Sequence, residues 1–172
     1  MSINAGILLF CLAILSPIYG LAAKETPFRE CANSKPSPLS IRIENCSDLP
    51  CETVQGERFH IAIQFLAMKD TSTQLSADVS VRTTTGLEIP FDLDEPQRNV
   101  CNNLLNGAYC PLYATEDVTF DLAIVLNNSL GRSVVEVNLQ DEVSKEVVAC
   151  FITEVHTRTI SPKFRFVNFE KL

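Results

Sequence analysis

Apolar and polar residues alternate along most of the chain from residue 39 onward, and this period of two limits the fold more than any other feature. Phe59, Ile61, Ile63 and Phe65, for example, alternate with more polar or smaller neighbours. A half-buried strand gives this pattern, whereas an amphipathic helix repeats about every 3.6 residues. The pattern predicts seven strands, over residues 39–43, 58–65, 75–82, 87–93, 118–126, 132–140 and 146–156. About seven antiparallel strands without a sustained helical period predict an all-β sandwich.

The first 23 residues predict an export signal that takes no part in this fold. Residues 1–23 contain no Asp, Glu, Lys or Arg, and an apolar run over residues 5–15 ends before Pro17. This is typical of a cleaved signal peptide, with an uncleaved anchor as the alternative, although the run is short for a membrane span. We therefore expect one domain over residues 24–157 and a Phe-rich tail over residues 158–172, in a protein that is secreted or reaches the lysosomal lumen. The tail is interpreted either as an added edge strand or as a contact with a partner or membrane surface.

Six of the seven cysteines remain once the signal, which contains Cys11, is removed. They are Cys31, Cys46, Cys51, Cys101, Cys110 and Cys150. An even number in an exported chain predicts three disulfides rather than a metal site. Loop closure favours two local pairs, Cys46 with Cys51 and Cys101 with Cys110, which leaves the first and last cysteines for a long-range bridge. The sequence alone does not choose among the connectivities.

Charge and motifs exclude several classes of function. With 14 basic and 21 acidic residues the net charge is −7, so the chain would repel a nucleic acid. There is no Gly-x-Ser-x-Gly motif, the two histidines, His60 and His156, have no catalytic partner in the sequence, and the acidic run Asp92–Glu95 lacks the glycine and distal Glu of a calcium loop. We expect no enzymatic activity, no cofactor and no metal. Two sequons, at Asn45 and Asn127, predict N-glycosylation sites.

Six segments around the cysteines form a recognisable framework that extends over the exported chain to about His156. They are Phe28–Cys31, Cys46–Cys51, Gly86–Pro96, Cys110–Leu112, Val134–Asp141 and Cys150. This framework resembles the ML lipid-recognition domain family, and the chain looks like a divergent, arthropod-like relative of the sterol carriers in it. The resemblance implies an immunoglobulin-like β-sandwich with an apolar ligand held between two sheets. It also implies the disulfides Cys31–Cys150, Cys46–Cys51 and Cys101–Cys110.

One pocket residue can be carried over from the family. The segment Ile89–Asp92 matches a Val-Pro-Phe-Pro segment whose aromatic residue lines the pocket of the sterol carriers, so the resemblance assigns Phe91 to the pocket. The chain departs from the family pattern at Asp92, which replaces the second proline, and at Val137, which replaces a Trp. It also has Asn128–Ser129 where a Tyr-Pro step is usual.

Inward positions of the predicted strands are the candidate walls of the ligand site. Beside Phe91 they are Phe59, Ile61, Phe65, Val79, Val81, Phe120, Leu122, Ile124, Val135, Val137 and Phe151. The same residues would equally fill an ordinary closed core, and alternation alone does not distinguish the two.

The predicted function is a secreted, non-enzymatic carrier that binds a sterol or a similar hydrophobic lipid for intracellular or extracellular transport. We expect a monomer that contacts a membrane or a receptor transiently to transfer its ligand. Two alternatives are innate-immune recognition of bacterial lipids and carriage of hydrophobic semiochemicals. Recognition of anionic bacterial lipids is less favoured because the basic residues Lys69, Arg98 and Arg132 are scattered in an acidic chain.

Overall fold

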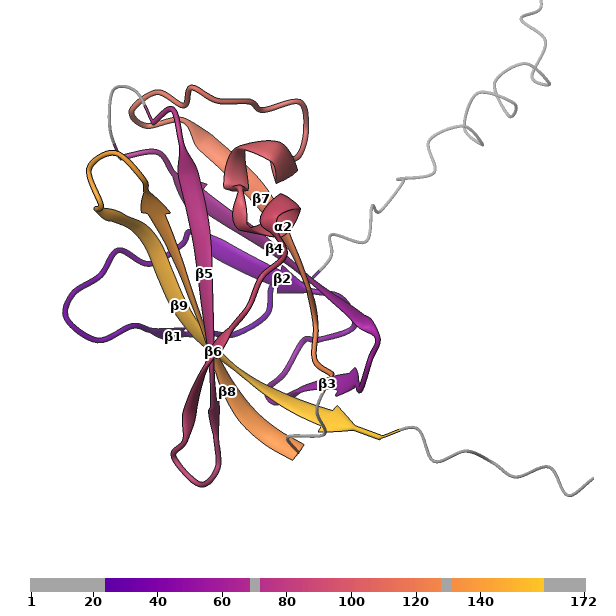
Figure 1. Ribbon diagram of the computed structural model, residues 1–172. Coiled ribbons are helices and arrows are strands. Elements are labelled where there is room, and N and C mark those ends of the chain that lie inside the picture. The colour runs from indigo at the N-terminus through magenta and orange to yellow at the C-terminus, as the bar shows by residue number, and fades with distance from the viewer. Residues whose placement is uncertain (1–23, 69–71, 128–130, 160–172) are drawn as a thin grey trace, which may run out of the picture.

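Two β-sheets face each other in the structure, a computed structural model that describes residues 24–68, 72–127 and 131–159 (Figure 1). One sheet has six strands and the other has three. The predicted all-β sandwich is therefore confirmed, while the predicted signal peptide and the tail beyond Thr159 lie outside the described residues. In the part of the chain described here, no helix has the length and apolar character needed to cross a membrane.

The six-stranded sheet has the strand order β1–β9–β8–β5–β6, with β3 also paired to β9. Its strands are β1 (Arg29–Glu30), β3 (Cys51–Val54), β5 (Leu75–Thr83), β6 (Glu88–Phe91), β8 (Gly131–Asp141) and β9 (Val147–Arg158). The pairing is antiparallel except between β3 and β9, which are parallel. One edge of β9 therefore carries two short strands in succession, β1 beside Phe151 and Ile152 and β3 beside residues 155–158. At the other edge of the sheet lies β6, which contains Pro90.

The three-stranded sheet consists of β2 (Ser40–Ile43), β4 (Arg58–Leu66) and β7 (Asp117–Val125), with β4 in the middle. The ladder between β4 and β7 is continuous, from Arg58 opposite Val125 to Leu66 opposite Asp117. Phe59, Ile61, Ile63 and Phe65 are buried whereas their neighbours along β4 are not, as the alternation predicted. This face of the sheet therefore meets the six-stranded sheet.

The seven predicted strands are all present, and the structure adds β1 and β3. Neither shows the alternation, because β1 consists of the two charged residues Arg29 and Glu30, and in β3 the polar Thr53 is buried whereas the apolar Val54 is not. The long connection predicted between residues 92 and 114 also contains a helical turn, α2 (Glu95–Arg98), and a 3-10 turn, η2 (Val100–Asn103). Both contact β5 and β7, so this connection passes along the side of the sandwich where those strands lie.

Three disulfides join the cysteines as the family resemblance implied. Cys31 pairs with Cys150, Cys46 with Cys51 and Cys101 with Cys110, with Cα–Cα distances of 5.8, 5.2 and 5.6 Å. The first connects the segment after β1 to β9, the second closes the loop from β2 to β3, and the third lies in the connection between β6 and β7. The frame of the sandwich is thus fixed covalently at three separate places.

Candidate ligand-binding site between the sheets

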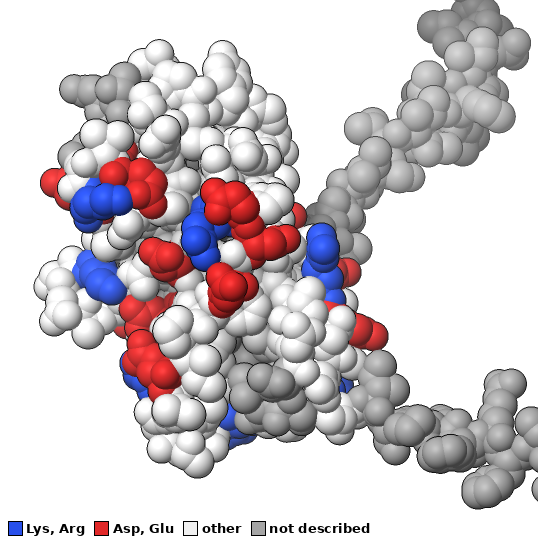
Figure 2. Space-filling model, in the orientation of Figure 1, with Lys and Arg blue, Asp and Glu red and all other residues white. Residues whose placement is uncertain are grey.

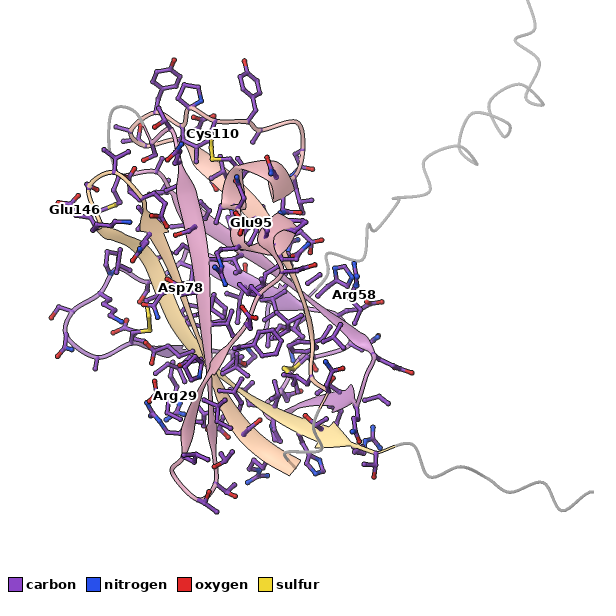
Figure 3. The ribbon with its side chains drawn as sticks, viewed as in Figure 1. Arg29, Arg58, Asp78, Glu95, Cys110 and Glu146 are labelled. Atoms are coloured by element: carbon purple, nitrogen blue, oxygen red, sulfur yellow. A yellow bond between two sulfur atoms is a disulfide. The ribbon has the colours of Figure 1, made fainter. Side chains whose placement is uncertain are left out.

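Eleven of the twelve candidate residues lie in one buried core between the sheets. Each is at most 7% exposed, and all belong to one continuous hydrophobic cluster. Figure 3 shows side chains from both sheets filling the space between them. The three-stranded sheet contributes Phe59, Ile61, Phe65, Phe120, Leu122 and Ile124, and the six-stranded sheet contributes Val79, Val81, Val135, Val137 and Phe151.

The strand registers explain why these side chains meet. Side chains opposite each other in a ladder point to the same face of a sheet, so partners on the inner face pack together. Ile61 lies opposite Leu122 in the three-stranded sheet. Val79 and Phe151 both lie opposite Val137 in the six-stranded sheet. The strand pairing therefore gives each sheet an apolar inner face.

Further residues of the same core were not among the candidates. They include Ile41, Ile43, Ile63, Leu139 and Val155, all buried in the same cluster. The signal that could have found them is the one used for the others, because each occupies an inward position of its strand. The apolar core between the sheets is therefore larger than the predicted set.

Phe91 is the twelfth candidate and differs from the rest. It is the last residue of β6, opposite Val79, and its half-buried side chain packs against the core. Phe91 and Val79 also line an open groove of about 620 Å³ at this edge of the six-stranded sheet. The next residue, Asp92, accepts a hydrogen bond from Nη2 of Arg98 at 3.2 Å. Phe91 thus lies between the core and the surface.

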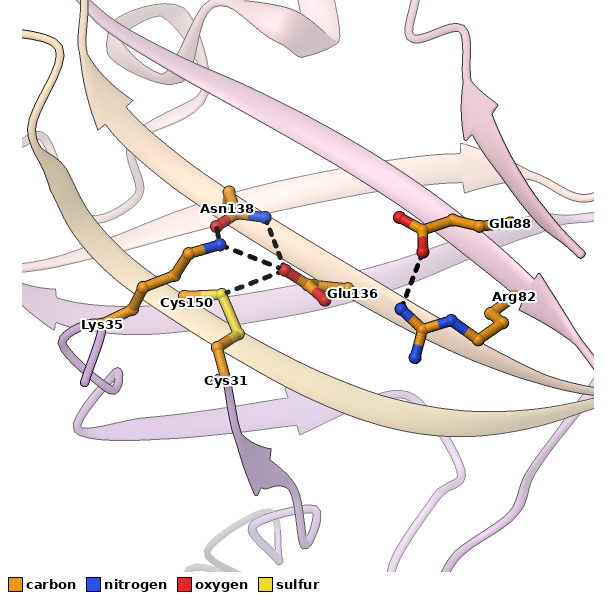
Figure 4. A network of polar contacts seen from close by, with 7 residues as sticks. All are labelled: Cys31, Lys35, Arg82, Glu88, Glu136, Asn138 and Cys150. Atoms are coloured by element: carbon orange, nitrogen blue, oxygen red, sulfur yellow. Dashed lines mark hydrogen bonds and ion pairs between the residues drawn. A yellow bond between two sulfur atoms is a disulfide. The ribbon is translucent and has the colours of Figure 1, made fainter. Parts of the chain in front are cut away.

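The rest of that groove is polar because it lies over the outer face of the sheet. Glu88, Glu136 and Asn138 line it, and Figure 2 shows acidic side chains gathered over the middle of this face. Nζ of Lys35 lies 2.8 Å from Oδ1 of Asn138 and 3.3 Å from Oε1 of Glu136 (Figure 4). Nη2 of Arg82 donates to Oε2 of Glu88 at 2.7 Å, which lowers the pKa of Glu88. A hydrocarbon chain here would remove water from charged groups, so this groove does not suit an apolar ligand.

A second cleft, of about 360 Å³, opens between β3 and the start of β4. Thr53 of the six-stranded sheet and Phe59 of the three-stranded sheet both line it. Both are buried side chains, so the inner faces of the two sheets approach the surface at this cleft. The residues around them are mostly charged or polar, namely Glu44, Asn45, Glu52, Glu57, Arg58 and His60.

The two histidines pair with carboxylates. Nδ1 of His60 lies 3.2 Å from Oδ2 of Asp121, across the ladder between β4 and β7. Nδ1 of His156 lies 3.0 Å from Oε1 of Glu52, whose other oxygen accepts from Nε of Arg158 at 2.7 Å. The hydrogen bond with His156, followed by the charge of Arg158, lowers the pKa of Glu52. Each pair occupies positions that alternate with the inward residues of its strands, so it lies outside the apolar core.

One group of side chains in the described residues has ligand atoms close enough for a metal ion, but its chemistry does not fit one. Sγ of Cys31, Sγ of Cys150 and a carboxylate oxygen of Glu136 lie within 4.8 Å of one another. The two sulfurs form a disulfide, so neither is available as a thiolate ligand.

The structure describes all three residues of the sequon at Asn45, but only the first residue of the sequon at Asn127. Asn45 is exposed in the turn after β2, with a φ of 57°. Asn127 is exposed after β7, and its backbone oxygen accepts a hydrogen bond from Nε2 of Gln55 at 2.6 Å. The other two residues of the second sequon, Asn128 and Ser129, lie outside the described residues. Glycosylation at both asparagines stays a prediction.

Comparison with known proteins identifies the family. The sequence matches the ML domain model over residues 25–157. A Niemann-Pick type C2 protein from the Japanese carpenter ant has a similar structure, with a TM-score of 0.63 and 16% identity over 77% of this chain and 99% of that one. Chicken MD-1, solved in complex with lipid IVa, has a TM-score of 0.46 and 17% identity over 75% of this chain and 87% of its own. No curated protein matches the sequence. Since the family model covers most of the chain and the ant protein shares its fold, the chain belongs to the ML domain family.

Proposed function

We propose that the chain is a secreted, non-enzymatic carrier that binds a sterol or a similar hydrophobic lipid between its two sheets. The observation that carries this proposal is the single apolar core shared by both inner faces, which reaches a cleft at Phe59. Membership of the ML domain family supports lipid binding as the class of function. Delivery of the lipid to a membrane or a receptor is part of the same proposal.

The physical basis of carriage is removal of hydrocarbon from water. Burial stabilises an apolar molecule by about 25 cal/mol for each Å² of surface that leaves water, and no covalent step is needed. A bound lipid would replace part of the contacts that the inner side chains make with one another, such as those around Phe65, Phe120 and Phe151. Three disulfides would keep the frame intact during that exchange.

Lipid binding is tested with the full chain produced in a eukaryotic secretion host. Native mass spectrometry of the secreted protein would identify any lipid that co-purifies, and the delipidated protein would then be titrated with a fluorescent sterol and a fluorescent fatty acid. We expect saturable binding of one lipid per chain by protein whose circular dichroism shows an intact β-fold. Folded protein that binds no sterol, fatty acid or hydrophobic semiochemical would contradict the proposal. Binding of lipid A alone would favour immune recognition instead.

Export is tested on the same material. We expect the secreted protein to begin at Lys24 by N-terminal sequencing, and its mass to fall after N-glycosidase treatment. Replacement of Asn45 or Asn127 by Gln should each remove one glycan. Protein retained in the cell with residues 1–23 intact would contradict cleavage of the signal peptide.

A further inference from the structure

Three hydroxyl groups are buried on the inner face of the six-stranded sheet. Ser133, Thr153 and Thr157 are 2%, 0% and 2% exposed. In the described residues, none of their three Oγ atoms has a hydrogen-bond partner. Buried hydroxyl groups in native proteins nearly always have a partner, since leaving one without a hydrogen bond costs free energy. A partner outside the polypeptide would remove this cost.

The three hydroxyls occupy neighbouring positions at one end of the sheet. Thr153 lies opposite Val135, and Ser133 lies opposite Val155, which stands between Thr153 and Thr157 along β9. All are buried positions that alternate with more exposed ones, so the hydroxyls share the inner face with the candidate ligand residues. The next inward residue of β9 beyond Thr153 is Phe151, part of the apolar core. Between Thr153 and Phe151, the inner face therefore changes from positions that include hydroxyl side chains to positions that are apolar.

Two other buried hydroxyls are in a different situation. Ser72 and Ser76 also lack a well-formed hydrogen bond. They lie beside the carboxylates of Asp141 and Glu142, however, and contribute to lowering the pKa of those groups. Among the described residues, the ladder partners of Ser133, Thr153 and Thr157 are apolar residues, Gly131 and the threonines Thr83 and Thr53, and none is a carboxylate.

The cleft between β3 and β4 is the surface opening that lies next to these hydroxyls in the sheet. Thr53, which lines the cleft, is paired with Thr157 in the parallel ladder of β3 and β9. Figure 1 places β3 beside the C-terminal end of β9. Thr157 is therefore the hydroxyl nearest to the cleft in the ladder, and Ser133 and Thr153 lie further along the same inner face, among Val135 and Val155 of the apolar core.

We propose that Ser133, Thr153 and Thr157 form a polar subsite that receives the hydroxyl or carbonyl group of a bound lipid. This inference rests on the proposed carrier function and specifies its ligand, a neutral lipid with one small polar group, such as a long-chain alcohol, a ketone or a sterol. The polar group lies at the β3 end of the interior, and the hydrocarbon extends toward Phe151 and Phe120. An ionised headgroup is disfavoured because Val135 and Val155, next to the hydroxyls, offer it no countercharge.

The test compares two probes that differ by one hydroxyl, 1-dodecanol and dodecane, in their ability to displace the dye N-phenyl-1-naphthylamine from the delipidated full chain. Thr153→Val keeps the shape of the side chain and removes its hydroxyl. We expect it to weaken 1-dodecanol binding by about tenfold and to leave dodecane binding unchanged. Thr153→Ser keeps a hydroxyl and should retain the affinity for 1-dodecanol. Thr119→Val, on the outer face of β7, is the matched control and should change neither probe.

Unfolding temperature separates this role from a structural one. A hydroxyl without a partner in the ligand-free protein makes Thr153→Val more stable than the wild type, whereas a hydroxyl that stabilises the fold makes it less stable. A lower unfolding temperature, or equal loss of both probes, would overturn the subsite. If Thr153→Val does not fold, the hydroxyl is structural, and Ser133→Ala repeats the comparison of probes at the neighbouring position. Failure of the wild type to bind the dye or either probe would contradict the carrier function itself.

Discussion

Asp141 holds the turn between β8 and β9 through a buried carboxylate. Its Oδ1 accepts hydrogen bonds from the backbone N–H groups of Ser144 at 2.8 Å and Val143 at 3.0 Å. These bonds, that of Ser144 foremost, lower the pKa of Asp141 below its ordinary value of 3.8. Because the pKa is lower in the folded state, the carboxylate stabilises the fold at pH values above 3.8. That contribution is lost as the pH falls through the folded pKa.

Asp141→Ala is expected to lower the free energy of unfolding by about 2 kcal/mol at neutral pH, because two backbone donors lose a charged acceptor. The difference from the wild type should be smaller at about pH 2, because the stabilisation by the carboxylate is lost as the pH falls through the folded pKa. Urea denaturation at both pH values measures this. Asp78→Ala, at an exposed position of β5, is the control, with an expected change within about 0.5 kcal/mol. An equal loss at both pH values would show that the charge of Asp141 is not responsible.

Phe91 provides the residue-level test of the lipid site. Its side chain packs against the core while remaining half-exposed, so its removal should open the edge of the site without unfolding the sandwich. We expect Phe91→Ala to reduce lipid affinity by about tenfold, in line with loss of part of an apolar contact surface. Fluorescent sterol titration measures this, with Leu87→Ala at an exposed position as control. Unchanged affinity, or a large loss of stability, would assign Phe91 a purely structural role.

At this scale the sequence predicts apolar positions well and polar exceptions poorly. Phe65 and Phe120 could be placed inside because they keep the period of their strands. Thr153 was not among the candidates, because a hydroxyl in an alternating segment is ordinarily assigned to the solvent face, although the residue keeps the period of Phe151 and Val155. The strand register shows that Thr153 and Ser133 share the inner face with Val135.

Among the elements, α2 stabilises an edge of the three-stranded sheet through one side chain. Oε1 of Gln97 accepts a hydrogen bond from the backbone N–H of Ala123 in β7 at 2.7 Å. β7 is an edge strand, so this N–H has no strand partner on that side. Gln97 thereby couples the long connection to the sandwich.

Gln97→Ala is expected to leave the N–H of Ala123 without its acceptor and to lower the free energy of unfolding by about 1 to 3 kcal/mol. Hydrogen exchange of the Ala123 amide should become faster than in the wild type. Gln97→Glu keeps an oxygen acceptor at the same reach, a carboxylate in place of the amide, and should protect the Ala123 amide. Unchanged exchange at Ala123 in the Ala variant would show that water replaces Gln97 at no cost.

Strands whose sequence alternates between apolar and polar residues were predictable, including the four-residue strands β2 and β6, and elements without this alternation were not. β4 and β7 each offer several repeats of the alternation. β3 and α2 show no such alternation, because Thr53 is the buried residue next to Val54 in β3 and α2 has the sequence Glu-Pro-Gln-Arg. Their conformation depends on tertiary partners, β9 for β3 and the neighbouring strands β5 and β7 for α2. The local sequence of β3 and α2 does not show which strands they contact.

For the whole molecule, the disulfides differ in how much chain they enclose. Cys31 and Cys150 are 119 residues apart, whereas Cys46 and Cys51 are 5 apart. Cross-linking restricts the unfolded chain more when the loop is longer. The bridge between Cys31 and Cys150 should therefore contribute most to global stability.

Replacing Cys31 and Cys150 together by Ala is expected to lower the free energy of unfolding by about 5 kcal/mol, against about 2 kcal/mol for Cys46 and Cys51. Guanidinium denaturation of the oxidised double variants measures both values. Equal losses would indicate that local packing around each bridge, rather than restriction of the unfolded chain, determines its effect.

The two edges of the six-stranded sheet also affect whether separate copies of the molecule aggregate through this sheet in concentrated solution. Open strand edges promote pairing between chains, which leads to aggregation. Along β9 that edge is occupied by β1 and β3, which run in opposite directions, and at the other edge Pro90 has no N–H to donate. Neither border of the six-stranded sheet therefore offers a long, regular template on which a neighbouring copy could extend that sheet.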